Sequence, residues 1–163
     1  MPAEAKPRRG FTLIELLIVL AVIVILATIA LPSVQGRLVR DQIVEGAKLA
    51  DVAKGPVAAA WTTARRFPLD NAEAGLPPAD RIVGNLVSAV TVDGGAIHVT
   101  FGNRANGALA GKTLSLRPAV VDDAPVVPVA WVCAGALPPA KMSVRGVDRT
   151  TIPARYLPLN CRR

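Results

Sequence analysis

One carboxylate lies at the start of the most apolar stretch of the chain, and its chemistry needs an explanation. Residues 16–31 read LLIVLAVIVILATIAL, with Thr28 as the only polar side chain, and Glu15 directly precedes them. A carboxylate at the centre of a membrane costs about 2.5–3.5 kcal/mol, and less near an end, so such a residue indicates a function and a cationic partner. If the chain were cut before Phe11, a new α-amine would lie four residues from Glu15, on the same or a neighbouring chain. The chemistry expected of Glu15 is therefore charge pairing.

The stretch that follows Glu15 is long enough to cross a membrane once. Residues 11–31 would span about 32 Å as a helix, against a hydrocarbon core of roughly 30 Å. A conventional secretory signal explains the basic residues before the stretch. However, this stretch is longer than usual, has a charge inside its start, and offers only a weak cleavage site at residues 28–30. A simple membrane anchor explains the length but not Glu15, whereas an anchor that is cut before Phe11 explains both.

The residues around Glu15 form a specific motif. Residues 8–16 read RRGFTLIEL, and this sequence resembles the processing motif of type IV prepilins. The resemblance implies that residues 1–10 are a cytoplasmic leader, which a membrane prepilin peptidase removes by cutting between Gly10 and Phe11. It also implies N-methylation of Phe11 and a role for Glu15 in subunit assembly.

The excess of basic residues lies at the two ends of the chain. The formal net charge of +7 divides into +2 for residues 1–10, zero for residues 11–132 and +5 for residues 133–163. Three Lys/Arg residues precede the apolar stretch and three follow it closely, but those of the leader are nearer, which favours a cytoplasmic N-terminus. The C-terminal segment predicts either a solvated surface or a salt-sensitive contact with nucleic acid.

Two cysteines, Cys133 and Cys161, lie late in the chain and far from the apolar stretch. With no histidine beside them and no CxxC spacing, a zinc site is not expected. In an oxidising compartment the pair would form a disulfide. Closing that loop would stabilise the fold by roughly 3–4 kcal/mol through the entropy of the unfolded chain.

Other reactive residues are sparse, and no catalytic or cofactor site is expected. His98 is the only histidine, and its place between Ile97 and Val99 on an alternating strand predicts a side chain that points to solvent or to a neighbouring chain. Asp122 and Asp123 are expected in a loop. Neither a phosphate-binding loop nor a metal-ligand spacing is present in the sequence. We therefore predict that the protein is not an enzyme and carries no metal or cofactor.

An amphipathic stretch follows the apolar one. Pro32 predicts a helix kink, because proline removes a backbone hydrogen bond. Beyond it, apolar residues recur every three to four positions and predict one buried helix face; they are Val39, Ile43, Ala47, Ala50, Ala53, Val57 and Trp61. We predict one helix over residues 11–62, and Gly55 and Pro56 leave open a second kink or an early end.

The remainder, residues 63–163, is predicted to form a globular head around a small antiparallel sheet. Alternating or β-branched residues predict four strands, at residues 86–92, 96–101, 113–117 and 127–133, with a Gly-Gly turn between the first two. The proline-rich residues after the last strand are expected to be irregular. The fold class is therefore α+β. Residues 11–31 of the long helix form the membrane or filament-core part, and residues 32–62 pack on the sheet.

A resemblance to type IVa pilins extends over nearly the whole chain, in the order and spacing of residues 70–76, 90–92, 97–100 and 131–133. It implies a structural subunit that leaves the inner membrane and forms a helical filament with copies of itself on the cell surface. It also implies contacts with the prepilin peptidase, the assembly machinery of the inner membrane and minor pilins. DNA and host or abiotic surfaces are further candidate partners, in DNA uptake, twitching motility and adhesion.

One alternative shares the N-terminal motif, namely a pseudopilin of a type II secretion system or a minor pilin. The loop closed by Cys133 and Cys161 favours a pilin. The carboxylates of the calcium site that is common in major pseudopilins are not evident near the C-terminus.

Overall fold

The computed structural model of the protein describes residues 10–162, and for residues 31–34 only the backbone. The predicted leader therefore lies outside the described residues, apart from Gly10. The chain divides into two compact units, Met1–Arg37 and Leu38–Arg163, whose boundary falls within one helix.

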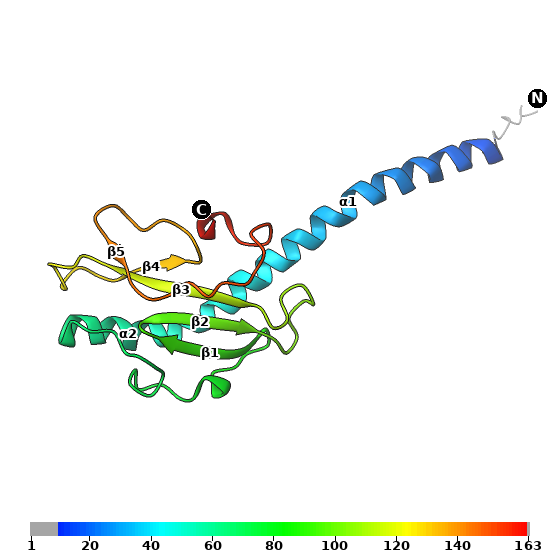
Figure 1. The fold of residues 1–163 in the computed structure, drawn as a ribbon. Helices are drawn as coiled ribbons and strands as arrows, with labels where there is room; N and C mark the ends of the chain where they lie inside the picture. Colours follow the sequence, from blue (N-terminus) through cyan, green and yellow to red (C-terminus); the bar gives the residue numbers. More distant parts are fainter. Residues whose placement is uncertain (1–9, 163) are drawn as a thin grey trace, which may run out of the picture. The chain divides into compact units, whose positions relative to one another are not determined.

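Three helical elements follow one another without a break. They are α1 (Leu13–Ala47), the 3-10 turn η1 (Lys48–Ala50) and α2 (Asp51–Ala64) (Figure 1). The prediction of one long N-terminal helix is confirmed. It ends where Arg65 adopts a left-handed conformation (φ 54°) and donates its N–H to the carbonyl oxygen of Trp61 at 3.0 Å.

Neither proline of the helical stretch ends it. The backbone of α1 stays helical through Pro32, and the kink predicted there remains a prediction. Pro56 lies inside α2, which continues to Ala64, so the early end considered for Gly55 and Pro56 is wrong. The local tightening occurs earlier, at η1.

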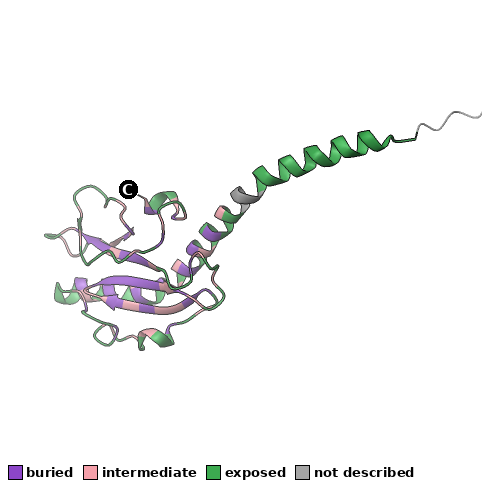
Figure 2. Cartoon of the chain, turned by 45° about the vertical axis from the view of Figure 1, so that its right-hand side comes forward, coloured by how far each residue is buried: buried purple, intermediate pink, exposed green. Residues whose placement is uncertain are grey.

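The helical stretch after Leu38 buries the predicted apolar stripe. Six of its seven residues are buried and Ala47 is partly buried. Their neighbours on the opposite side, such as Asp41 and Glu45, are exposed. Figure 2 shows this alternation of buried and exposed residues along the second part of α1. The apolar stripe of the amphipathic stretch is therefore its buried side, and these charged residues lie on its exposed side.

An antiparallel sheet packs on this stripe. Its order is β1 (Val87–Asp93), β2 (Ala96–Phe101), β3 (Thr113–Val120) and β4 (Ala130–Cys133), and a two-residue strand, β5 (Ser143–Val144), pairs with β3 (Figure 1). Residues of the helix and the strands form one hydrophobic core. The predicted α+β class, with a long helix on a small antiparallel sheet, is confirmed.

The later strands differ from their predicted bounds. β3 continues through Pro118. This proline is tolerated because β2 pairs with β3 only as far as Leu116, so no residue of β2 needs the N–H that proline lacks. The carbonyl oxygen of Pro118 accepts the N–H of Arg145 at 2.8 Å. β4 begins only at Ala130, after Pro128. β5 lies in the stretch expected to be irregular, and two residues are too few to show an alternation.

Helix and sheet approach closely at Gly46 of α1. A Cβ atom built there would overlap the ring of Phe101, which is fully buried at the end of β2. Only glycine lets the helix settle at this depth on the sheet.

Candidate functional site

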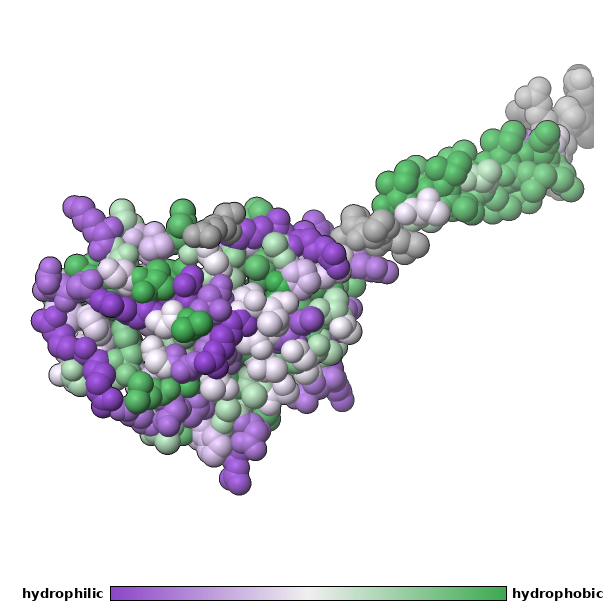
Figure 3. Space-filling view, viewed as in Figure 1, coloured by the Kyte–Doolittle hydropathy of each residue, from purple (hydrophilic) through white to green (hydrophobic). Residues whose placement is uncertain are grey.

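The N-terminal part of α1 has no cover within its own unit. Every described residue from Gly10 to Ala30 is exposed, including large apolar side chains such as Phe11 and Leu13. Figure 3 shows these apolar side chains spread over the visible face of the segment. The helix that contains it is long and apolar enough to cross a membrane, with a mean hydropathy of 3.1 over 18 residues. Such a surface requires lipid or other apolar partners around it.

Glu15 lies in the first turn of this helix, as predicted. Its N–H donates to the carbonyl oxygen of Thr12 at 3.1 Å, and the Thr12 hydroxyl lies 3.4 Å from its carboxylate. Thr12 and Glu15 thus stand three residues apart, as in a capping box, a signal that our sequence analysis did not use. Within residues 10–162 no cationic group contacts the Glu15 carboxylate. Its charge is therefore available to a partner outside this part of the chain.

The bond between Gly10 and Phe11 lies just before the helix. Both residues are exposed and non-helical. A Cβ atom built on Gly10 would meet no other heavy atom within 4 Å. An exposed peptide bond outside the helix is compatible with cleavage by another protein.

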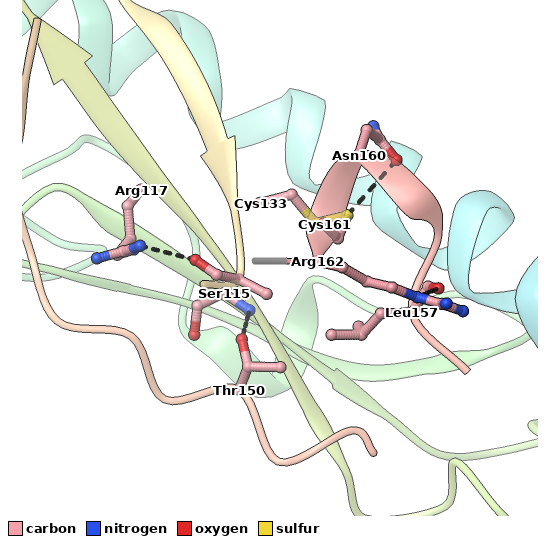
Figure 4. The surroundings of a disulfide bond; sticks show 9 residues. Ser115, Arg117, Cys133, Thr150, Leu157, Asn160, Cys161 and Arg162 are labelled. Atoms are coloured by element: carbon pink, nitrogen blue, oxygen red, sulfur yellow. Dashed lines mark hydrogen bonds between the residues drawn. A yellow bond between two sulfur atoms is a disulfide. The ribbon is translucent and has the colours of Figure 1, made fainter. Parts of the chain in front are cut away.

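The two cysteines form a disulfide, as predicted. Cys133 ends β4, and Cys161 lies in the C-terminal 3-10 turn η3 (Leu159–Cys161). Figure 4 shows the sulfur atoms between these two elements, with the Arg162 side chain donating to the carbonyl oxygen of Leu157 nearby at 2.9 Å. The bond therefore attaches the end of the chain to the last long strand of the sheet.

A groove of about 290 Å³ lies beside this disulfide, between the helical stretch and strands β3 and β4. Val44 and Trp131 give it apolar walls, and Lys48, Asp51 and Asn160 add polar groups. Trp131 is only partly buried. Trp61, by contrast, is buried, with its ring 5.1 Å from that of Phe67.

His98 is buried, and its predicted orientation toward solvent or a neighbouring chain is wrong. The residue is only 4% exposed, because the segment around Arg149 covers the second face of the sheet. The Ser115 hydroxyl accepts the N–H of Arg149 at 2.8 Å and shares a hydrogen bond of 2.9 Å with Nδ1 of His98. Burial lowers the pKa of His98, and the Arg149 guanidinium lowers it further.

Ser115, His98 and Asp93 superficially resemble a catalytic triad. The Asp93 carboxylate lies 3.9 Å from Nε2 of His98, which has no hydrogen-bond partner. Ser115, however, is fully buried, and its oxygen is occupied by a backbone N–H. No substrate could reach this hydroxyl, so the cluster is structural.

The basic C-terminal segment is partly neutralised by the fold. Arg145 pairs with Asp122 at 2.6 Å, and Arg149 pairs with Asp93. The hydrogen bond from Arg145, followed by one from Ser143, lowers the pKa of Asp122. Across residues 10–162 no group of three potential metal ligands is found.

Comparisons with known proteins indicate the family to which the chain belongs. Residues 39–162 match the pilin family of bacterial filament proteins, and residues 5–31 match the prokaryotic N-terminal methylation motif. The chain is 35% identical over 162 residues to the type IV major pilin protein PilE1 of Neisseria gonorrhoeae, covering 95% of this chain and 87% of that protein. It is 34% identical to the fimbrial protein EcpC of Eikenella corrodens, covering 95% of this chain and 91% of that protein. The chain belongs to the pilin family, whose members are structural subunits of bacterial filaments and not enzymes.

Proposed function

We propose that the chain is made as an inner-membrane precursor, processed at its N-terminus and then assembled into a type IV pilus. Residues 1–10 are the cytoplasmic leader in this scheme, and residues 11–31 span the membrane once. A prepilin peptidase cuts between Gly10 and Phe11 and methylates the new amine. The observation that carries the proposal is an apolar helix exposed on every side, with one carboxylate in its first turn.

The exposed apolar segment explains both stages of this scheme. In the precursor, residues 11–31 are surrounded by lipid, which covers all faces of the helix at once. In the filament, the same residues pack among copies of themselves. The apolar surface is therefore covered by lipid before assembly and by neighbouring subunits after it. Residues 32–62 then join this core to the head, residues 63–163. The assembly machinery of the inner membrane and minor pilins are the expected helpers of this transfer.

Glu15 supplies the register of this assembly. Its carboxylate contacts no cation in the described part of the chain. Cleavage before Phe11 creates an α-amine that can neutralise it on a neighbouring subunit. A subunit in the wrong register would leave both charges unpaired in an apolar core, which is strongly unfavourable.

Mass spectrometry of the protein from its native envelope tests the processing step. We expect a chain that begins at methylated Phe11 and is two hydrogens lighter than its reduced form. A chain that begins near Leu31 would show a conventional signal peptide instead. An uncut chain would indicate a simple anchor.

Substitution of Glu15 tests the assembly step. Glu15→Gln keeps the size of the side chain but removes its charge, so we expect normal cleavage and severely reduced filament yield. Glu45→Gln is the matched control, since Glu45 is an exposed carboxylate in the later part of the same helix. Wild-type yield from Glu15→Gln would rule out the pairing role.

The alternative of a pseudopilin or a minor pilin is less well supported. The similarity to a type IV major pilin over 95% of the chain favours a pilus subunit. Quantification of the proteins in sheared surface filaments separates these possibilities, because a major pilin dominates them in copy number. Absence of the chain from such filaments would favour the pseudopilin.

A role in DNA uptake rests on the basic C-terminal segment alone. Arg145 and Arg149 are already paired with aspartates, which reduces their value as phosphate contacts. Duplex DNA binding by the full chain that persists after charge reversal of Arg145, Arg149 and Arg155 would exclude an electrostatic site there. Adhesion and twitching motility depend on the assembled filament and are tested with it.

A further inference from the structure

Three arginines of the compact unit Leu38–Arg163 gather around one loop near the C-terminus. Arg40 of α1 and Arg162 each donate to the backbone carbonyl oxygen of Arg155, both at 3.1 Å. Their donor nitrogens therefore lie within 6.2 Å of each other, twice that distance. The side chain of Arg155 is exposed and lies over the ring of Tyr156, 4.7 Å from its centroid. We call these three residues the arginine cluster.

The arginine cluster differs from Arg145 and Arg149 in its charge balance. Arg145 and Arg149 have aspartate partners. Among residues 10–162, no carboxylate lies within 4.0 Å of the guanidinium groups of the arginine cluster. The guanidinium groups of Arg40 and Arg162, which meet at one carbonyl oxygen, repel one another, and an anion between them would remove the repulsion.

Within residues 10–162, most of the hydrogen-bonding capacity of the arginine cluster is unused. Each guanidinium group carries five N–H donors in a planar fork. Arg40 directs one donor to the chain, and Arg162 directs one to Arg155 and another to Leu157. The remaining donors suit the oxygens of a phosphate, which guanidinium groups bind in a bidentate manner.

The position of the cluster along the chain indicates the source of that phosphate. Arg40 follows Leu31, the last residue of the apolar stretch, by only nine residues. The chain alone therefore keeps Arg40 close to the end of the proposed membrane span, at about 14 Å if the intervening residues are helical. Anionic headgroups attract basic residues that lie next to a span.

We propose that the arginine cluster, Arg40, Arg155 and Arg162, binds the phosphodiester of an anionic lipid headgroup while the subunit is in the membrane. The inference rests on the membrane stage of the proposed function, but not on cleavage or on filament formation. The bound lipid holds the head at the membrane surface until the subunit is extracted. Extraction then requires exchange of this headgroup.

Lipid titration followed by native mass spectrometry tests the site on the full chain in a mild detergent. We expect wild-type protein to retain one phosphatidylglycerol and to prefer it to phosphatidylcholine, which has no net charge. Replacing all three arginines by glutamine should weaken phosphatidylglycerol binding roughly a hundredfold, at about 1 kcal/mol for each charge. Replacing Arg155 alone should weaken it roughly fivefold on the same scale.

The variants are chosen to separate binding from folding and from bulk charge. Arg155→Gln leaves the hydrogen bonds of Arg40 and Arg162 in place, because both use the backbone carbonyl oxygen of residue 155. A control in which Arg81, Arg104 and Lys112, all exposed, become glutamine removes the same charge elsewhere on the head. This control should bind phosphatidylglycerol as the wild type does.

Several outcomes would overturn the proposal. Equal binding of both lipids by the wild type, or an equal loss in the control, would show that no specific site exists. Displacement of phosphatidylglycerol by millimolar inorganic phosphate would identify free phosphate as the ligand. Normal lipid binding by the triple variant together with lost filaments would show that the cluster contacts a second copy of the chain. Unprocessed protein would still give the lipid result, so failure of the proposed processing is recognised separately.

Discussion

Two parts of one helical stretch, residues 13–30 and residues 38–64, share a backbone conformation but differ in environment. Every described side chain of the first part is exposed, whereas the second part buries one stripe against the sheet (Figure 2). Apolar residues of the first part point in all directions, and no single surface of one chain could cover them. In the second part they recur on one face, which the sheet matches.

The difference shows where each part obtains its stability. Helical hydrogen bonds contribute similarly to the stability of both parts, so the difference in stability comes from packing. The head supplies the packing partner of residues 38–64 from its own sequence. Residues 13–30 depend on lipid or on other subunits, and this dependence makes the segment available for assembly.

The largest expected effect on stability comes from a test of this contrast, in which one isoleucine is replaced in each part of the helical stretch. Ile43 is 1% exposed and Ile23 is 54% exposed. Ile43→Ala should lower the free energy of unfolding of the head by about 2–5 kcal/mol, because it leaves a cavity in the core. Ile23→Ala should change it by less than about 0.5 kcal/mol.

Denaturation of the full chain in detergent, followed by tryptophan fluorescence, measures both effects. Trp61 and Trp131 both belong to the compact unit Leu38–Arg163 and report on its unfolding alone. An equal loss for the two variants would mean that the two parts of the helix unfold together, contrary to the comparison.

Loss of the disulfide should be next in size. Cys133→Ser with Cys161→Ser should lower the unfolding free energy of the head by roughly 3–4 kcal/mol, since the unfolded chain gains entropy. The circular dichroism of residues 11–31 in detergent should not change. The same denaturation experiment checks the loss, and a helix signal that falls with it would link the two parts.

Two glycines of α1 sharpen the comparison further. Gly46→Ala should destabilise the head by about 1–3 kcal/mol, because the added methyl group overlaps the ring of Phe101. Gly36→Ala is the matched control, since a Cβ atom there would meet nothing within 4 Å. The midpoint of thermal unfolding should fall only for Gly46→Ala. A fall for both would point to backbone effects rather than to packing.

The smallest expected effect is a pH dependence confined to the head. Burial and Arg149 hold the pKa of His98 below its usual value of 6.5, while Asp93 and Asp148 oppose this shift. The folded state therefore binds this proton less readily than the unfolded state. Stability should be complete above pH 6.5 and fall below it, by at most about 1.4 kcal/mol per pH unit.

Replacement of the histidine isolates this contribution. His98→Gln should remove the slope of unfolding free energy between pH 6.5 and pH 5, where Asp122, whose pKa is lowered, contributes little. Urea titrations at several pH values measure it. An unchanged slope in His98→Gln would assign the pH dependence to other groups.

The features that the sequence predicted correctly are those with local or strongly periodic signals. The stripe from Val39 to Trp61 repeats at helical spacing and is buried as expected. The hairpin of β1 and β2 turns at Gly94 and Gly95, both with positive φ. The pairing of Cys133 with Cys161 needed only that two cysteines were present.

The features that the sequence did not predict depend on contacts between distant residues. The alternation of β2 predicts that His98 points to solvent, yet residues near Arg149 cover the face of the sheet on which it lies. Trp131 lines a groove because β4 is short and the helix does not fully cover it. The arginine cluster joins Arg40 to the C-terminal loop across 115 positions of the chain. No local pattern contains such information.

The disulfide also determines how the head would carry mechanical load. A subunit stretched between its N-terminal helix and its C-terminus passes the force directly from Cys133 to Cys161. Residues 134–160 lie outside that load path, and about 90 Å of extended chain stays hidden from the pulling direction. Reduction of this one bond would therefore lengthen a stretched subunit by that amount, without breaking any other covalent bond.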